Sequence, residues 1–229
     1  MKRAFFITGT DTGVGKTEAA CMLARAFRAA GLKPGVMKPV ETGCPERDGR
    51  LVPTDALRLK EASGTEAPLE LINPYRFAPP LAPFTASELS GATIDFERIR
   101  SCLKELSNMH DLMLVEGAGG LLTPIAQDTY MADLALDLGL PAIIVSANRL
   151  GTINHTLMTI KCAGYMGIKV AGIILNNPGP NGSDPSRAHN RASIERLSPA
   201  PILFEAPFSS KNEAPFLPEE GLVASLLRA

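Results

Sequence analysis

The chain has 229 residues and a formal net charge of −1, so its charge balance gives no reason to expect nucleic acid or an anionic membrane as a partner. Apolar residues make up 45% of the sequence, which is an ordinary proportion for a globular protein. No apolar run approaches the roughly 18 residues that a membrane-spanning helix needs.

The N-terminus and the cysteines both favour a cytoplasmic location. The apolar part of the N-terminus, residues 4–7, is too short for a signal peptide. The four cysteines are scattered, without a CxxC pair or a nearby histidine, which argues against a zinc site and against a disulfide framework. The length suits one α/β domain covering residues 1–229.

The first predicted elements are a short buried strand over residues 4–8, the glycine-rich stretch GTDTGVGKT at 9–17, and a helix over 16–30. Unpaired backbone N–H groups at a helix N-terminus point towards an anion, and glycines let a phosphate come close to them. In such a loop Lys16 adds a positive charge to the outer phosphates, and the Thr17 hydroxyl can bind magnesium. We interpret the stretch as a phosphate-binding loop.

The loop is a variant of the usual pattern, because Thr10 stands where a glycine is expected. A glycine-rich turn with a solvated lysine is the alternative. The strand before the loop and the helix after it favour the nucleotide site.

Lys38 lies inside a predicted buried strand over residues 35–40. A lysine is rarely buried without a partner. Either its stem follows the edge of the sheet and the amine reaches water, or the side chain points out at the carboxyl end of the strand, where ligands bind in parallel sheets.

Residues 41–53 and 73–84 are expected to be loops, the second with extended backbone and covering part of the site, because it holds Pro74, Pro79, Pro80 and Pro83. Between them we expect a helix with Thr54 as its N-cap. Asp55 would then lie in the first turn, where the helix dipole alone can explain an acid. A further helix is expected over residues 95–107.

Glu116 closes a buried strand over residues 111–116 and is followed by a glycine cluster at 117–120. An acid at such a strand end, across from a phosphate loop, is where nucleotide enzymes hold magnesium; the alternative is an acid that only marks the end of the strand. The cluster does not fit the dinucleotide fingerprint, since Leu122 stands where its third glycine belongs.

Helices and strands alternate over the rest of the chain. We expect helices over 130–138, 154–164 and 185–197, strands over 142–146, 170–175 and 202–204, and a short helical turn over 222–227. This alternation predicts an α/β fold with a single doubly wound, mostly parallel sheet of the P-loop NTPase type and helices on both faces.

The motifs together resemble the dethiobiotin synthetase family, in the family's order and over nearly the whole chain. They are GTDTGVGKT at 9–17, KPVETG at 38–43, TDAL at 54–57, NPYRFAPPLAP at 73–83, VEGAGG at 115–120, LGTINHTLMT at 150–159 and PAPI at 199–202. The resemblance implies an ATP- and Mg²⁺-dependent ring closure. In it, 7,8-diaminononanoate takes up CO2 as a carbamate, the carbamate attacks the γ-phosphate, and the second amine displaces phosphate.

The resemblance also implies roles for particular residues. Lys38 would hold the carbamate and the γ-phosphate, with Lys16 and Thr10 beside it as the other catalytic groups. The ATP would contact Gly13, Val14, Gly15, Lys16, Thr17, Asn176 and Pro207, with Asn176 reading the adenine. The magnesium set would be Thr17, Asp55 and Glu116. The diamine would contact Thr10, Lys38, Thr42, Gly119, Gly151 and Asn154.

In the family the turn at 151–154 binds the substrate carboxylate of the neighbouring subunit, so the resemblance implies a homodimer. The turn opens a predicted helix, which suits it to receive a carboxylate. Two positions depart from the family. Phe84 stands where many members have histidine, and Asn190 where some have a tyrosine near the carboxylate.

A dimeric P-loop ATPase switch of the partitioning or cell-division type is the rival hypothesis. Those proteins carry a second lysine near the start of the loop, where this chain has Asp11. The chain also lacks a basic face and a membrane-binding C-terminal helix. The sequence leaves the nucleotide preference open, since Asn176 is the one polar residue that it assigns to the pocket for the base.

Overall fold

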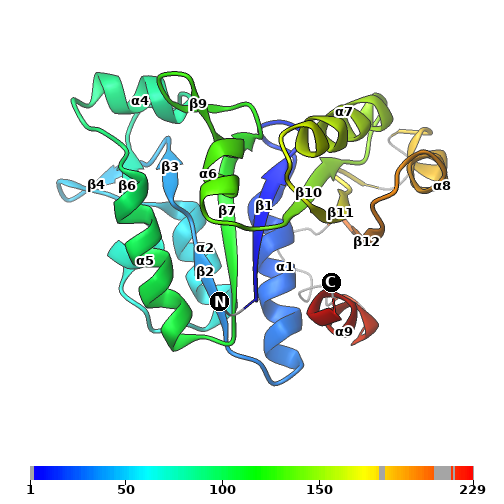
Figure 1. The fold of residues 1–229 in the computed structure, drawn as a ribbon, viewed down its shortest axis with the longest axis horizontal. Helices are drawn as coiled ribbons and strands as arrows, with labels where there is room; N and C mark the ends of the chain where they lie inside the picture. The colour runs from blue at the N-terminus through cyan, green and yellow to red at the C-terminus, as the bar shows by residue number, and fades with distance from the viewer. Residues whose placement is uncertain (1–2, 181–183, 209–217, 219, 229) are drawn as a thin grey trace.

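A six-stranded parallel sheet forms the centre of the protein in the computed structural model, which describes residues 3–180, 184–208, 218 and 220–228 (Figure 1). The strand order is β12-β11-β10-β1-β7-β2. The strands are β1 (Arg3–Gly9), β2 (Pro34–Met37), β7 (Leu112–Gly120), β10 (Ala142–Ala147), β11 (Val170–Asn176) and β12 (Ile202–Ala206). The predicted doubly wound α/β fold is confirmed, and every pairing in this sheet is parallel.

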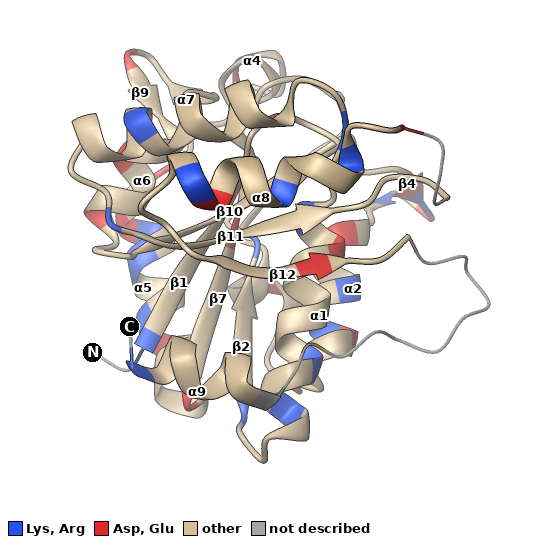
Figure 2. Ribbon diagram, turned by 90° about the vertical axis from the view of Figure 1, so that its right-hand side faces the viewer, with Lys and Arg blue, Asp and Glu red and all other residues tan. Residues whose placement is uncertain are grey.

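Helices cover both faces of the sheet. The larger ones are α1 (Lys16–Ala29), α2 (Thr54–Ser63), α5 (Phe96–Met109), α6 (Met131–Asp137), α7 (Thr152–Tyr165), α8 (Arg187–Leu197) and α9 (Glu220–Arg228). Helix α1 connects β1 to β2, which lies two strands away in the sheet, and α5 precedes β7, which lies between them. The two connections run in opposite directions across the sheet, and because both are right-handed, α1 and α5 lie on opposite faces. Figure 2 shows α1 and α2 on one side of the sheet and α5 and α6 on the other.

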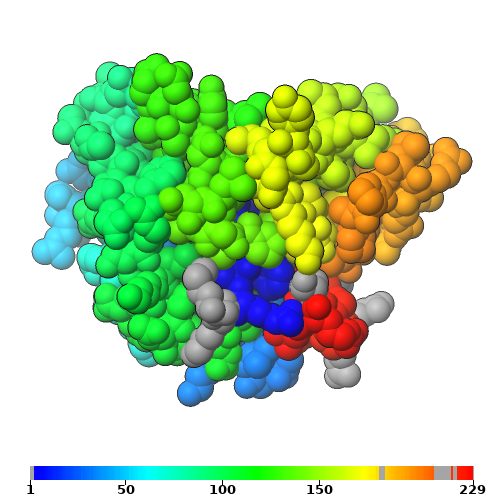
Figure 3. Space-filling view, in the orientation of Figure 1, coloured from blue at the N-terminus to red at the C-terminus, as the bar shows by residue number. Residues whose placement is uncertain are grey.

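The last helix packs beside the first strand. Figure 3 shows α9 next to the start of the chain, and the Arg3 guanidinium donates to the Leu226 carbonyl at 3.0 Å. No helix in the described part of the chain is long and apolar enough to cross a bilayer. That residues 1–229 form one domain stays a prediction, since several of them lie outside the described ranges.

The predicted strand over residues 35–40 is wrong in its second half. The strand β2 ends at Met37, and the chain continues as β3 (Val40–Thr42), which pairs with β6 (Tyr75–Phe77) outside the main sheet. Pro39 has no N–H to donate to the ladder. Lys38 instead donates its N–H to the Ile72 carbonyl at 2.7 Å, and Asn73 Nδ2 donates to the Lys38 carbonyl at 2.7 Å.

The two stretches expected to be loops contain short elements. Besides β3 and β6, they hold the hairpin β4 (Glu46–Arg47) and β5 (Arg50–Leu51), and the start of α4 (Pro83–Leu89). Two further small elements are α3 (Leu69–Ile72) and the pair β8 (Pro124–Ala126) and β9 (Thr129–Tyr130). Strands of two or three residues carry too little periodicity to be recognised from sequence.

Thr54 is not the N-cap of α2, contrary to the sequence-based expectation. The N-cap is Pro53, which has no side-chain acceptor, and Thr54 is the first helical residue. The cap comes from Glu41 on β3, whose carboxylate accepts from the Asp55 N–H at 2.9 Å and the Ala56 N–H at 3.0 Å. A distant side chain therefore satisfies the free N–H groups at this helix end.

Replacing Glu41 by alanine removes this cap, so we expect the free energy of unfolding to fall by about 1–2 kcal/mol. Chemical denaturation followed by circular dichroism measures the change. Glu46→Ala is the matched control, since Glu46 is exposed on the small hairpin; its effect should stay within about 0.5 kcal/mol. Equal stabilities of the two variants would contradict this account of the helix start.

Candidate active site

The glycine-rich loop lies between β1 and α1, at the carboxyl edge of the sheet. Gly13 and Gly15 have φ angles of 74° and 92°, in the left-handed region that favours glycine. Two neighbouring strands hold the loop from outside. The Thr10 N–H donates to the Val145 carbonyl at the end of β10 at 2.9 Å, and Asn176 Nδ2, at the end of β11, donates to the Val14 carbonyl at 2.9 Å.

Lys16 is buried at the start of α1, and its ammonium donates to the Asp11 carbonyl of the same loop at 3.3 Å. Burial, together with the nearby charge of Lys38, lowers the pKa of Lys16 to about 8. An anion bound at the loop would offset both effects by favouring the charged amine. The loop is therefore electrostatically prepared for a phosphate group.

The second part of the site is an ion cluster around Lys38, which is 4% exposed. Its ammonium lies 2.5 Å from Glu116 Oε1 and 3.3 Å from Asp55 Oδ2. Burial by itself would lower the pKa of Lys38, but the carboxylates of Glu116 and Asp55 outweigh it and raise the pKa above its ordinary value. Of the two sequence-based alternatives for Lys38, the exposed sheet-edge position is excluded. The amine points into the site and stays charged.

The same cluster has oxygen atoms to offer a cation. The Thr17 hydroxyl donates to Glu116 Oε1 at 2.8 Å, while the buried Glu116 Oε2 has no hydrogen-bond partner among the described residues. Hard divalent cations such as Mg²⁺ take oxygen ligands of this kind. The described residues contain no group of three or more His, Cys, Asp or Glu side chains suited to a metal.

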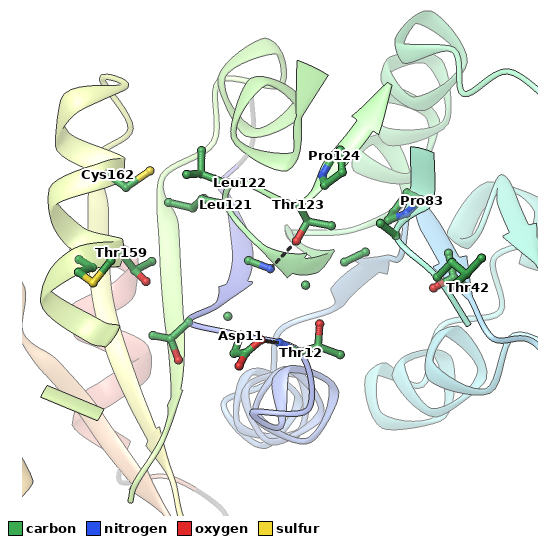
Figure 4. Close-up of a pocket in the computed structure, with 18 of the residues that line it drawn as sticks. Asp11, Thr12, Thr42, Pro83, Leu121, Leu122, Thr123, Pro124, Thr159 and Cys162 are labelled. Atoms are coloured by element: carbon green, nitrogen blue, oxygen red, sulfur yellow. Dashed lines mark hydrogen bonds between the residues drawn. The ribbon is translucent and has the colours of Figure 1, made fainter. Parts of the chain in front are cut away.

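A cavity of about 870 Å³ adjoins the loop (Figure 4). The loop side contributes Thr10, Asp11 and Thr12, and the opposite wall comes from the proline-rich stretch at 80–83 and from residues 118–124. The helix α7 closes one side with Thr159 and Cys162. A smaller cavity of about 340 Å³ lies over Lys16, Lys38 and Glu116, and Thr42 and Gly119 line both cavities. The two cavities therefore meet beside the loop.

The structure does not bring every predicted site residue to these cavities. Gly151 is the N-cap of α7, with a φ of 92°, and neither it nor Asn154 lines either cavity. Asn176 touches the loop, and Pro207 is exposed just beyond β12.

The two positions that depart from the family pattern are also absent from the walls of these cavities. Phe84 is half-buried on α4. Asn190 is buried in α8 and donates to Asn148 Oδ1 at 2.8 Å. Within one chain, neither side chain shapes the main cavity.

Sequence reasoning missed several residues that support the site. Asn73 braces the Lys38 backbone, Glu41 fixes the helix that carries Asp55, and the Thr123 hydroxyl accepts from the Gly120 N–H at 2.9 Å. Ser146 on β10 contacts the Thr10 hydroxyl. Ser146 ends the apolar run of the strand expected over 142–146, and a polar residue in that position is the one signal in the sequence that could have pointed to Ser146.

The chain is similar to known proteins over most of its length. A family model described as an AAA domain matches residues 3–215. A protein of Anaeromyxobacter dehalogenans is 48% identical over 196 residues, covering 86% of each chain, and one of Escherichia coli O157:H7 is 37% identical over 212 residues, covering 93% of each. A protein of Bacillus velezensis is 40% identical over 205 residues, covering 88% of this chain and 84% of its own. All three are named ATP-dependent dethiobiotin synthetases.

Solved structures share the fold at lower identity. A ParA-family ATPase from Chlorobium tepidum superposes with a TM-score of 0.52 at 18% identity, covering 100% of this chain and 90% of its own. The septum site-determining protein MinD from Pyrococcus horikoshii, in complex with Mg-ADP, gives a TM-score of 0.52 at 19% identity, covering 90% and 82%. These similarities establish the P-loop α/β fold.

The loop geometry predicts a selective effect of Gly15→Ala on nucleotide binding. A Cβ at Gly15 would lie 2.1 Å from Asn176 Nδ2, in addition to the strain of its φ of 92°. We expect the Kd for ATP, measured by calorimetry, to rise by roughly tenfold or more, because α1 cannot start in the same place.

Gly31→Ala is the matched control for this prediction. Gly31 has a φ of 80°, and a Cβ added there would have nothing within 4 Å, so the variant carries a similar backbone strain away from the site. It should lose stability by about 1 kcal/mol and bind ATP normally. If the two variants bound ATP equally well, the position of Asn176 against the loop would not matter for the nucleotide.

Proposed function

The chain belongs to the family of ATP-dependent dethiobiotin synthetases, and we propose that it closes the ureido ring of dethiobiotin from 7,8-diaminononanoate, CO2 and ATP. The protein is thus a ligase of biotin biosynthesis. One observation carries the chemistry: residues of the phosphate loop and the buried, charged Lys38 line the same cavity of about 340 Å³, which shares Thr42 and Gly119 with the larger one.

The reaction brings two anions together. One amine of the substrate attacks CO2 and loses a proton, which gives a carbamate. A carbamate oxygen then attacks the γ-phosphorus of ATP, and ADP leaves. The second amine attacks the carbonyl carbon of the mixed anhydride, phosphate leaves, and the ring closes. No step requires a covalent bond to the protein.

Charge neutralisation and positioning are therefore the main tasks of the site. Lys16 and the N-terminus of α1 attract the phosphates from one side. Lys38 approaches from the other, and Thr10, Thr42 and Gly119 lie where the diamine and the γ-phosphate would meet. We assign the catalytic roles to Lys16, Lys38 and Thr10 on this basis.

Thr17, Asp55 and Glu116 would hold Mg²⁺, and the unpartnered buried oxygen of Glu116 supports this assignment. The bound cation would neutralise phosphate oxygens as charge moves towards the leaving ADP. A cation at Glu116 would share its carboxylate with Lys38, so both positive groups would lie close to the γ-phosphate.

The adenosine would extend from the loop towards Asn176 and Pro207. One Nδ2–H of Asn176 is bonded to the Val14 carbonyl, which leaves the Asn176 oxygen to accept from the adenine amino group and a second N–H to donate. Adenine and cytosine both carry an exocyclic amino group, so this contact by itself does not select ATP over CTP.

A homodimer would complete the substrate site. Gly151 and Asn154 do not line the two cavities of this chain. Three apolar side chains nearby are exposed: Leu122 and Met158 line the main cavity, and Leu150 directly precedes the 151–154 turn. Covering these side chains with a second copy would bring the partner's turn to the substrate carboxylate. The substrates are small molecules, and we place the enzyme in the cytoplasm without a nucleic-acid or membrane partner.

An ATPase switch of the partitioning or cell-division type is the less supported alternative. The solved structures of that type share the fold at 16–19% identity, whereas the dethiobiotin synthetases reach 48%. Asp11 also stands where those proteins carry a second lysine in the loop.

Incubation of the purified protein with diaminononanoate, labelled bicarbonate and Mg-ATP should give a labelled, acid-stable ring product with one phosphate released per ring. Chromatography of the label and a phosphate assay measure the two yields. ATP hydrolysis that does not depend on the diamine, with no labelled carbon in the product, would contradict the synthetase assignment.

Lys38→Ala should abolish ring formation while the Kd for ATP changes little, because Lys38 approaches the carbamate side of the γ-phosphate. The variant leaves Glu116 buried without its cation, so we also expect a loss of roughly 3–5 kcal/mol in stability. Circular dichroism therefore accompanies the calorimetric Kd as a check of folding. If a folded variant lost ATP binding, Lys38 would belong to the nucleotide site instead.

A further inference from the structure

A buried group of hydroxyls joins the phosphate loop to helix α7. Ser146, on β10 and 1% exposed, lies at its centre. Its Oγ is 3.3 Å from the Thr10 Oγ1, 2.7 Å from the Thr152 Oγ1 and 2.9 Å from the Thr156 Oγ1. Thr152 and Thr156 are four residues apart on α7, so both face the end of β10. Only Thr10 of the four lines the main cavity.

The donor count at Ser146 restricts how these hydroxyls can point. A serine hydroxyl donates one hydrogen bond and accepts two. Thr156 donates to Ser146, which leaves one acceptor site and one hydrogen for Thr10 and Thr152. When Ser146 donates to one of these two threonines, it must accept from the other.

Two arrangements follow, and they differ at the cavity. If Ser146 donates to Thr152, Thr10 donates to Ser146, and the Thr10 oxygen offers only lone pairs to a ligand. If Thr152 donates to Ser146, Ser146 donates to Thr10, and the Thr10 hydrogen is free for a ligand. The first arrangement fits an amine N–H, and the second fits an oxygen of a carbamate or phosphate.

We propose that Ser146 is a positioning residue that sets the direction of the Thr10 hydroxyl, so that Thr10 can meet an amine as an acceptor and an anionic oxygen as a donor. This inference rests on the proposed function, in which an amine becomes a carbamate beside Thr10. Ser146 touches neither substrate nor nucleotide and acts only through Thr10. The backbone of Thr10 is held separately by the Val145 carbonyl.

A double-mutant cycle with Thr10 tests the proposal. Ser146→Ala should lower kcat for ring formation roughly three- to tenfold, as the loss of one hydrogen bond in the transition state does. Thr10→Val removes the hydroxyl with little change of shape. In that background Ser146→Ala should change kcat by less than about twofold. In a Thr10→Ser background, which restores a hydroxyl, the full effect of Ser146→Ala should return.

Thr156→Val is the matched control, because Thr156 is 0% exposed and binds the same Ser146 oxygen. It removes one donor but leaves Ser146 bonded to both Thr10 and Thr152. We expect lower thermal stability with kcat within about twofold of the wild type. The KM for Mg-ATP should stay within about twofold in Ser146→Ala as well, since the loop backbone keeps its own contacts.

An equal loss of kcat from Ser146→Ala in the wild-type and Thr10→Val backgrounds would overturn the proposal. So would a loss of kcat in Thr156→Val as large as that in Ser146→Ala. Phosphate release from Mg-ATP is followed in the same set of proteins. If the wild type released phosphate but made no ring product, the proposed function would fail. The same double-mutant cycle, measured by the rate of phosphate release, would still decide the role of Ser146.

Discussion

A buried ammonium needs opposite charge close by, and much of the site is arranged around this requirement of Lys38. The carboxylates of Glu116, on strand β7, and of Asp55, on helix α2, supply the charge. Removing one partner of such a pair typically costs about 3–5 kcal/mol, because the other charge stays buried without compensation. The elements that deliver Lys38, Asp55 and Glu116 are therefore held in a fixed relation, as a charge-neutralising site requires.

Hydrogen bonds made by Asn73 and Glu41 hold two of those elements in place. The break between β2 and β3 turns Lys38 out of the main sheet, and Asn73 holds the Lys38 carbonyl. Glu41, just beyond the break, caps the helix α2 and so places Asp55. Glu116 needs no such device, since it lies inside the nine-residue strand β7 between β1 and β2. The irregular backbone at Lys38 and Pro39 thus serves both the ion cluster and the helix that completes it.

The fold by itself does not distinguish this enzyme from ATPases that share its sheet. ParA and MinD superpose on nearly the whole chain, and one fold can host unrelated functions. The features of this chain that bear on its own chemistry lie beside the loop. They are the buried Lys38, the cavity walled by the proline-rich stretch and α7, and the group of hydroxyls around Ser146 that reaches Thr10.

The sequence by itself determined the α/β alternation and the phosphate loop at 9–17, because each depends on a local pattern of consecutive residues. It wrongly ended the following buried strand at Glu116, since β7 continues through the glycine cluster to Gly120. Its order of motifs also identified the family. Only the tertiary structure decided that β2 breaks at Lys38, that Glu41 rather than Thr54 caps α2, and that Ser146 meets Thr10. Each of these depends on contacts between residues that lie apart in the chain: 14 and 15 positions between Glu41 and the two residues that it caps, and 136 positions between Thr10 and Ser146. Such contacts leave no periodicity in the sequence; they form only once parallel strands bring their carboxyl ends to one edge of the sheet.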